Sequence, residues 1–178
     1  RSLNTLNKKG KIDFKIYDNI NISERNKIIE EILNQKKLRL KELNQKHEID
    51  KFSENFYKSF DERNFVGGNL HISSLKFNDT IISMHWGIIY KNTYYYLMPS
   101  IAKTEYLKYS PGRLLLYKLV EWCYQKNIKK FDLSLGEESY KENWSNLKSN
   151  LYDYYEANSL KSYPLVYLLK IRSYLKKS

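Results

Sequence analysis

Three side chains of this sequence have the chemistry of a general base. His85 lies in the middle of an alternating run, on the same side as Ser83, and its imidazole titrates near neutral pH. Asp132 alternates away from the apolar residues of its own run, and Glu137 stands at the expected start of a short helix. Each also has a purely structural interpretation. His85 would be a hydrogen-bonded histidine of the sheet, Asp132 an acceptor for neighbouring backbone N–H groups, and Glu137 a carboxylate stabilised by the helix dipole. We rank Asp132 and His85 above Glu137 as candidate bases.

The run Ser110-Pro111-Gly112-Arg113-Leu114 has the residue types of a phosphate-binding turn. Ser110 suits an N-cap and Pro111 the first helical position, so a helix should begin here. A helix N-terminus presents unpaired backbone N–H groups and the positive end of the helix dipole. Gly112 would let the backbone approach a ligand, and Arg113 would add a charge. An ordinary Ser-Pro helix cap has the same sequence, and the turn alone favours that simpler interpretation.

The net charge of +11 favours an anionic partner: nucleic acid, an acidic membrane or a phosphate-rich small molecule. A lysine-rich solvated surface explains the charge as well, and no zinc-finger, RRM or KH motif supports nucleic acid. The single cysteine, Cys123, excludes an intrachain disulfide and a structural zinc site. We therefore expect a reducing, cytoplasmic location and no metal. The first residue is Arg1, so we also expect that an upstream portion is missing.

The scaffold for these residues can be predicted from hydrophobic periodicity. We expect a strand over 11–17, then a helix over 24–46 with Ser23 as its N-cap, and a weaker helix over 47–63. Three strands separated by turn residues should form an antiparallel meander; they cover 69–77, 80–90 and 93–98. A largely buried helix should run from Pro111 to a left-handed end at Asn127.

The remaining chain predicts a strand over 130–135, a short helix over 137–143 and a strand over 151–156. A basic amphipathic helix should follow over 164–177, with cations at Lys170, Arg172, Lys176 and Lys177. It fits an anionic membrane surface, although packing on the domain or on a missing half is favoured. The fold class is α/β (α+β layered), a mixed, mostly antiparallel sheet flanked by helices. We expect one domain over 1–160 and the basic C-terminal helix over 161–178.

The segment 106–144 also resembles a known family. The Tyr-Ser-Pro-Gly helix start is followed by a Phe-Asp-x-x-x-Gly-x-x-x-Tyr-Lys-x-x-Trp pattern, formed by Phe131, Asp132, Gly136, Tyr140, Lys141 and Trp144. This closely resembles the GNAT-type acyltransferases associated with cellulose and exopolysaccharide biosynthesis. The resemblance covers nearly the whole chain, and the predicted strand order agrees with the GNAT fold. One departure is that only a single glycine remains of the usual Arg/Gln-x-x-Gly-x-Gly/Ala cradle.

The resemblance implies an acyl-CoA-dependent N- or O-acyltransferase, with acetyl-CoA or another acyl-CoA as donor. It places the coenzyme A pyrophosphate at residues 110–114 and implies direct transfer to a sugar, nucleotide sugar or glycan acceptor. Tyr140 would then hydrogen-bond or protonate the leaving sulfur, and Lys141 would contact a phosphate or the acceptor. Asp132, His85 or Glu137 would be the base.

Two other functions remain open at this point. A Fem-like aminoacyl-tRNA-dependent transferase shares the fold, and the positive charge and the lysine-rich helix fit tRNA as its donor. A degenerate GNAT domain that only binds a partner or glycan would explain the sparse cradle. Apart from tRNA in the first case, we expect no nucleic-acid partner.

Overall fold

The computed structural model describes residue 6 and residues 8–44, 49–60, 66–152 and 154–175. The chain divides into two compact units, 1–137 and 138–178, and each is described by itself. The predicted boundary between residues 160 and 161 is not tested by this division. No helix among the described residues is long and apolar enough to cross a membrane.

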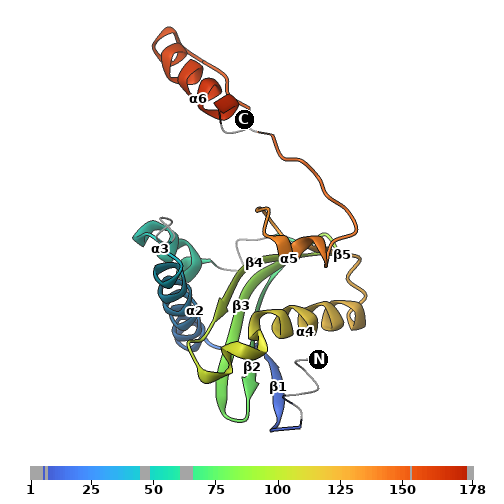
Figure 1. The fold of residues 1–178 in the computed structure, drawn as a ribbon. Helices are drawn as coiled ribbons and strands as arrows, with labels where there is room; N and C mark the ends of the chain where they lie inside the picture. The colour runs from blue at the N-terminus through green and yellow to red at the C-terminus, as the bar shows by residue number, and fades with distance from the viewer. Residues whose placement is uncertain (1–5, 7, 45–48, 61–65, 153, 176–178) are drawn as a thin grey trace. The chain divides into compact units, whose positions relative to one another are not determined.

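Unit 1 is built on a five-stranded sheet in which the strands lie in chain order (Figure 1). The strands are β1 (Ile12–Ile16), β2 (Gly68–Phe77), β3 (Thr80–Tyr90), β4 (Thr93–Ile101) and β5 (Lys130–Asp132). The first four pair antiparallel, and β5 joins β4 in parallel. The predicted meander is confirmed, and so is the mixed, mostly antiparallel class of the sheet. The predicted strand over 130–135 ends earlier, at Asp132.

The turns of the meander form at asparagine-containing pairs. Asn78 has a φ of 53°, and Lys91 and Asn92 have φ values of 44° and 62°. Asparagine tolerates this left-handed region better than most residues, which is why these pairs can close tight hairpins. The same property places Asn127, with a φ of 57°, just after the helix that precedes β5.

One face of the sheet is covered by two helices, α2 (Ile22–Glu42) and α3 (Lys51–Ser59). Apolar residues of α2 form the main core with the inner faces of β2, β3 and β4; the buried members are Ile29, Ile32, Leu33, Ile72, Met84, Trp86 and Met98. The N-cap of α2 is Asn21, whose side chain accepts the Glu24 N–H, so the prediction of Ser23 as the cap is wrong. The α2 helix also ends at Glu42 rather than at residue 46, and the prediction for 45–46 lies outside the described residues.

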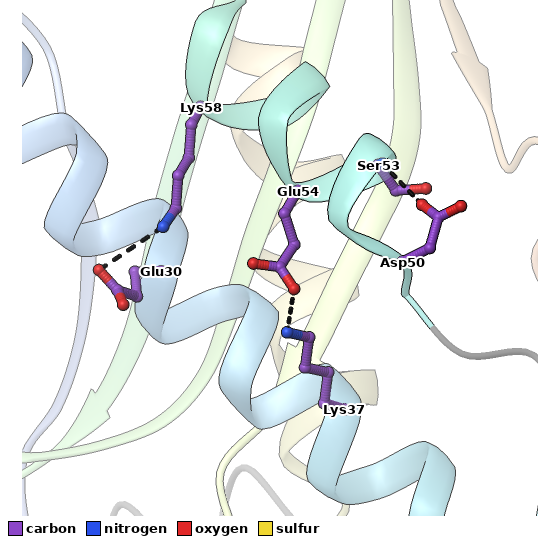
Figure 2. Close-up of polar contacts among 6 residues, drawn as sticks. All are labelled: Glu30, Lys37, Asp50, Ser53, Glu54 and Lys58. Atoms are coloured by element: carbon purple, nitrogen blue, oxygen red, sulfur yellow. Dashed lines mark hydrogen bonds and ion pairs between the residues drawn. The ribbon is translucent and has the colours of Figure 1, made fainter.

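Polar contacts join α3 to α2 (Figure 2). Lys58 of α3 lies 3.7 Å from the Glu30 carboxylate of α2, and Lys37 of α2 pairs with Glu54 of α3. Asp50 caps α3 by accepting the Ser53 N–H at 2.7 Å. Hydrogen bonding from the Ser53 side chain, and second from this backbone N–H, lowers the pKa of the Asp50 carboxyl group. The predicted helix over 47–63 is thus confirmed over 51–59, while 47–48 and 61–63 lie outside the described residues.

The opposite face of the sheet is covered by α4 (Pro111–Gln125), which follows the short 3-10 helix η2 (Glu105–Tyr109). The buried side of α4 consists of Pro111, Leu114, Leu115, Leu116, Leu119 and Cys123, as its nearly continuous apolar pattern predicts. Beneath it, the sheet presents four buried polar residues: His71, Ser73, Ser83 and His85.

Unit 2 contains α5 (Ser139–Glu142), the 3-10 helix η3 (Leu160–Ser162) and α6 (Tyr163–Leu175). The predicted short helix over 137–143 is confirmed for its central turn, and the helix over 164–177 is confirmed through Leu175. The predicted strand over 151–156 is wrong for the described residues, because 151–152 and 154–156 have no regular structure. Leu151, Tyr152 and Tyr154 are exposed there, and alternation forms a strand only where a neighbouring strand pairs with it.

Candidate active site

The pairing of β3 with β4 is irregular at one point. A second irregularity, between β2 and β3, lies at Leu75 and Lys76. Trp86 of β3 pairs with Met98 and Ile88 with Tyr95, so Gly87 alone lies opposite two residues of β4. This is a β-bulge with its extra residue in β4. It shifts the alternation of β4: Tyr94 contacts His71 and Trp122 on the α4 side, whereas Met98 belongs to the core on the α2 side.

The parallel pairing of β4 and β5 ends beside this bulge. Thr93, Tyr94 and Tyr95 pair with Lys130, Phe131 and Asp132, and β4 then runs on to Ile101 while β5 stops. Among the described residues, no strand pairs with β4 on that side beyond Tyr95. The edge of β4 from Leu97 onward is therefore available to an extended ligand that bears amide groups.

Gly87 is required by this local geometry. A Cβ atom at Gly87 would lie 2.4 Å from Cε1 of His85 and 2.6 Å from the backbone oxygen of Tyr95. The second contact is with backbone, which a rotamer change cannot relieve. The glycine therefore permits the bulge and the position of His85 at once.

His85 is fully buried under α4. Its Nδ1 lies 3.0 Å from the Tyr94 hydroxyl, and its ring stacks on Tyr96 with centroids 4.4 Å apart. Burial holds the pKa of His85 well below its usual range, with the neighbouring His71 as a second cause, so the imidazole is neutral. Its Nε2 has no hydrogen-bond partner among the described residues. The residue thus has the surroundings of a packed, neutral histidine.

His71 extends the same polar stripe on β2. Its ring contacts Trp122 at 4.5 Å and Tyr94 at 5.1 Å, and burial lowers the pKa of His71 to about 4. Its Nε2, like the hydroxyl of the adjacent Ser73, lacks a hydrogen-bond partner among the described residues. Buried polar atoms of this kind are commonly satisfied by ordered water. Burial also raises the pKa of the Cys123 thiol to about 12, which leaves it without thiolate reactivity at neutral pH.

The start of α4 confirms Pro111 at the first helical position but not the predicted side-chain cap. Ser110 adopts the left-handed conformation, φ 56° and ψ 58°, and its hydroxyl makes no capping bond. Its carbonyl instead accepts the N–H groups of Arg113 and Leu114 at 3.0 and 3.2 Å, and its own N–H donates to Leu107. Since Pro111 has no N–H, the Gly112 N–H is the main donor left for a ligand at this turn.

Gly112 also has a packing role. A Cβ at Gly112 would lie 2.9 Å from Cδ1 of Ile101, the last residue of β4. The first turn of α4 therefore lies directly against the end of β4. A buried hydrogen bond holds it there, because the Ser83 hydroxyl donates to the Pro111 carbonyl at 3.1 Å.

Cations surround the approach to this turn. Lys9 donates to the Tyr109 hydroxyl at 3.1 Å, and the ammonium groups of Lys9 and Lys108 lie 5.7 and 5.4 Å from the centre of the Tyr109 ring. The Arg113 side chain is exposed in the first turn of α4. Negative charge on a ligand at this turn would be stabilised by these side chains, which partly offsets the scarcity of N–H donors.

Asp132 and Glu137 are both exposed. The Asp132 Oδ1 accepts the Ser134 N–H at 2.7 Å, which stabilises the turn after β5, where Ser134 has a φ of 61°. Phe131, the residue before it, stacks on Tyr94 at 5.0 Å on the α4 side, so strand alternation directs Asp132 to the other face from His85.

Tyr140 and Lys141 belong to unit 2 and are described within it. Lys141 pairs with Glu138 at 2.8 Å, one helical turn before it. Burial raises the pKa of the Tyr140 hydroxyl, with the Glu138 carboxylate as a second cause, so Tyr140 is protonated at neutral pH. A protonated hydroxyl is the form that a proton donor needs. Their roles toward a ligand in unit 1 remain predictions.

Several contributors to this region were not found from the sequence: Gly87, Tyr94, Lys9, Lys108 and the hydrogen bond from Ser83 to Pro111. A glycine inside an apolar strand is a recognised sign of a bulge, so Gly87 could have been found. The others depend on contacts between distant segments. Within the described part of the chain, no group of three or more His, Cys, Asp or Glu side chains could hold a metal ion.

Comparison with known proteins gives a consistent result. Residues 1–142 match the family model described as "Acetyltransferase (GNAT) domain". A search of curated proteins found no match. A possible acetyltransferase from Clostridium difficile 630 is similar in structure, with 16% identity, a TM-score of 0.57, and coverage of 84% of this chain and 98% of that one. An aminoglycoside acetyltransferase from an uncultured soil metagenomic sample, solved in complex with sisomicin, has 9% identity, a TM-score of 0.52, and coverage of 83% and 97%.

Proposed function

Because the chain belongs to the acetyltransferase (GNAT) domain family, we propose that it transfers an acyl group from an acyl-CoA to an amine or hydroxyl of a sugar, nucleotide sugar or glycan intermediate. The chain is an acetyltransferase by family, and GNAT domains use acyl-CoA as donor. The acceptor class rests on the sequence pattern from Phe131 to Trp144, which resembles the cellulose and exopolysaccharide branch.

The donor proposal is carried by one observation: the free edge of β4 leads from the bulge to the first turn of α4. Ile101 ends the strand, and Gly112 lies directly against it. The five residues from Leu97 to Ile101 span roughly 16 Å at about 3.3 Å each, so an extended amide-containing arm can lie along them. The pyrophosphate would then lie at the Gly112 N–H, with Arg113, Lys108 and Lys9 as its cations.

The transfer itself requires few groups. The nucleophile of the acceptor attacks the thioester carbonyl, the carbon–sulfur bond breaks, and the proton lost by the acceptor replaces the acyl group on sulfur. Asp132, which is exposed at the end of the β4–β5 pairing, is our first candidate for the base. Tyr140 is the candidate donor to sulfur. We rank His85 below Asp132 as a candidate base. The His85 imidazole is buried, and burial separates it from an acceptor.

The donor is tested by calorimetric titration of the full chain with acetyl-CoA, CoA and ADP. We expect acetyl-CoA and CoA to bind more tightly than ADP, and Arg113→Gln to weaken acetyl-CoA about tenfold, as loss of a charged hydrogen bond would. Lys126→Gln, at the other end of α4, is the matched control and should bind normally. Absence of acetyl-CoA binding at millimolar concentration contradicts the proposal.

Acceptors are then screened with acetyl-CoA and amino sugars, nucleotide sugars and oligosaccharides. Asp132→Asn should lower kcat by about 10²–10⁴ while the fold persists, because an amide oxygen can still accept the Ser134 N–H. If acetyl-CoA does not bind but aminoacyl-tRNA binds in a salt-sensitive manner, the Fem-like transferase replaces this proposal. If the donor binds and no acceptor reacts, a binding role without catalysis is favoured. We place the reaction in the cytoplasm, where a reduced Cys123 and CoA thioesters are both expected.

A further inference from the structure

The strongest unexplained feature lies outside unit 1, in helix α6. Its first two turns are almost entirely apolar or aromatic, running Tyr-Pro-Leu-Val-Tyr-Leu-Leu from Tyr163 to Leu169. Large side chains in and just before the helix are exposed, by between 40% and 88%: Leu160, Tyr163, Leu165, Tyr167, Leu168 and Ile171. Exposed apolar surface of this extent marks an interaction site.

The charges around this apolar run have a single sign. From Ala157 to Ser178 the sequence contains five cations, Lys161, Lys170, Arg172, Lys176 and Lys177, and no Asp or Glu. The last acidic residue before this stretch is Glu156. Four of the cations follow the apolar run, and one precedes it. A protein partner would have to offer an apolar groove with a wholly acidic rim, whereas a bilayer with anionic headgroups offers both properties everywhere on its surface.

The dimensions agree with a surface location. Seven residues of helix measure roughly 10 Å at about 1.5 Å each, too short to cross a hydrocarbon core of about 30 Å. A helix of this kind lies in the plane of the interface, where its apolar side chains enter the boundary between headgroups and acyl chains to a depth of roughly 5–10 Å. Tyrosine favours that boundary, and the helix has tyrosines at 163 and 167.

We propose that α6 binds the surface of an anionic phospholipid bilayer, with the apolar residues 163–169 in the headgroup–acyl boundary and the cations Lys170 and Arg172 among the headgroups. This inference concerns unit 2 alone and does not depend on the acyl-transfer activity. The helix supplies two binding signals, apolar insertion and a basic cluster, and stable membrane association usually requires two.

The test is co-sedimentation of the full chain with vesicles of pure phosphatidylcholine or of phosphatidylcholine containing phosphatidylserine. Each surface cation contributes about a fivefold gain in partitioning onto anionic lipid, so Lys170→Gln/Arg172→Gln should weaken binding about 25-fold. Leu165→Asn/Leu168→Asn should lower binding to both kinds of vesicle. These side chains are exposed, so far-UV circular dichroism and the thermal midpoint should stay unchanged.

A matched control separates a specific site from net charge. Lys126→Gln/Lys129→Gln removes the same two charges from exposed positions of unit 1 and should leave binding intact. The proposal is overturned if the protein binds both vesicles equally, if it binds neither, or if the control pair loses as much binding as the α6 pair. It is also overturned if light scattering without lipid shows self-association that Leu165→Asn/Leu168→Asn abolishes, because a second copy would then cover the helix.

Discussion

At the scale of single residues, two buried neutral histidines couple the stability of unit 1 to pH. The folded pKa of His71, about 4, lies below the value of 6.5 for an unperturbed histidine. The unfolded chain therefore binds more protons than the folded chain as the pH falls below 6.5, and stability is lost in that direction. The pKa of His85 is also lowered by burial, so it contributes to the pH dependence in the same direction.

We predict that unfolding free energy falls by about 2 kcal/mol between pH 7 and pH 5 through His71 alone. This window lies above the range in which carboxylates with lowered pKa values, such as Glu42, take up protons. Urea titrations at several pH values measure the slope, and His71→Gln should flatten it. A pH-independent stability of the unmodified chain over this window would contradict the assigned burial.

Gly87 provides the second prediction at this scale. In Gly87→Ala the new methyl group meets the Tyr95 carbonyl and the His85 ring, so we expect a loss of at least about 2 kcal/mol in unfolding free energy. Gly112→Ala is the control, because the atom in its way is the flexible end of Ile101 and alanine favours a helix. The control should keep its stability within about 1 kcal/mol. Equal losses in the two variants would show that the bulge has no special requirement for glycine.

At the scale of elements, much of the scaffold was predictable because its signals are local. The hairpins form at Asn78-Asp79 and Lys91-Asn92, and α4 begins at Pro111, since these residues restrict their own backbone. His85 and Ser83 do share a face, as alternation predicts. The bulge opposite Gly87 could not be placed from periodicity, because it depends on how two strands pair. The burial of His85 under α4 and the early end of β5 likewise depend on segments far apart in sequence.

The hydrogen bond from Ser83 to Pro111 gives a prediction for the position of α4. Ser83→Ala removes a buried donor from β3, and we expect a loss of about 1 kcal/mol in stability. If the first turn of α4 binds the donor substrate, loss of the hydrogen bond that holds this turn should raise the KM for acetyl-CoA with little change in kcat. Ser83→Thr, which retains a hydroxyl, should preserve more of both. An unchanged KM in Ser83→Ala would mean that packing against Ile101 alone positions the turn.

At the scale of the whole molecule, the chain combines a packed sheet domain with a second unit of different character. Between α5 and η3 the described residues form no helix or strand, and Leu147, Leu151, Tyr152 and Tyr154 are 74% to 85% exposed. Exposed backbone outside helices and strands, with exposed aromatic side chains, is a preferred substrate of proteases such as chymotrypsin.

Limited digestion with chymotrypsin should therefore cut the described region first at Tyr152 or Tyr154, leaving the sheet and its helices intact. Mass spectrometry of early fragments identifies the sites. Initial cleavage at the buried Tyr94 or Tyr96 would contradict the division into a stable sheet domain and an accessible connecting segment.

The bulge in β4 also constrains how the length of this strand can vary. Tyr94 must face α4 while Ser100, whose hydroxyl donates to Gln35 at 2.9 Å, must face α2, and the extra residue reconciles the two. Deleting one residue while the bulge persists would turn one end of the strand over, whereas deleting the extra residue itself would restore regular pairing and leave both faces unchanged. In an alignment of related chains, a single gap between these positions should therefore mark the absence of the bulge and coincide with the loss of the glycine opposite.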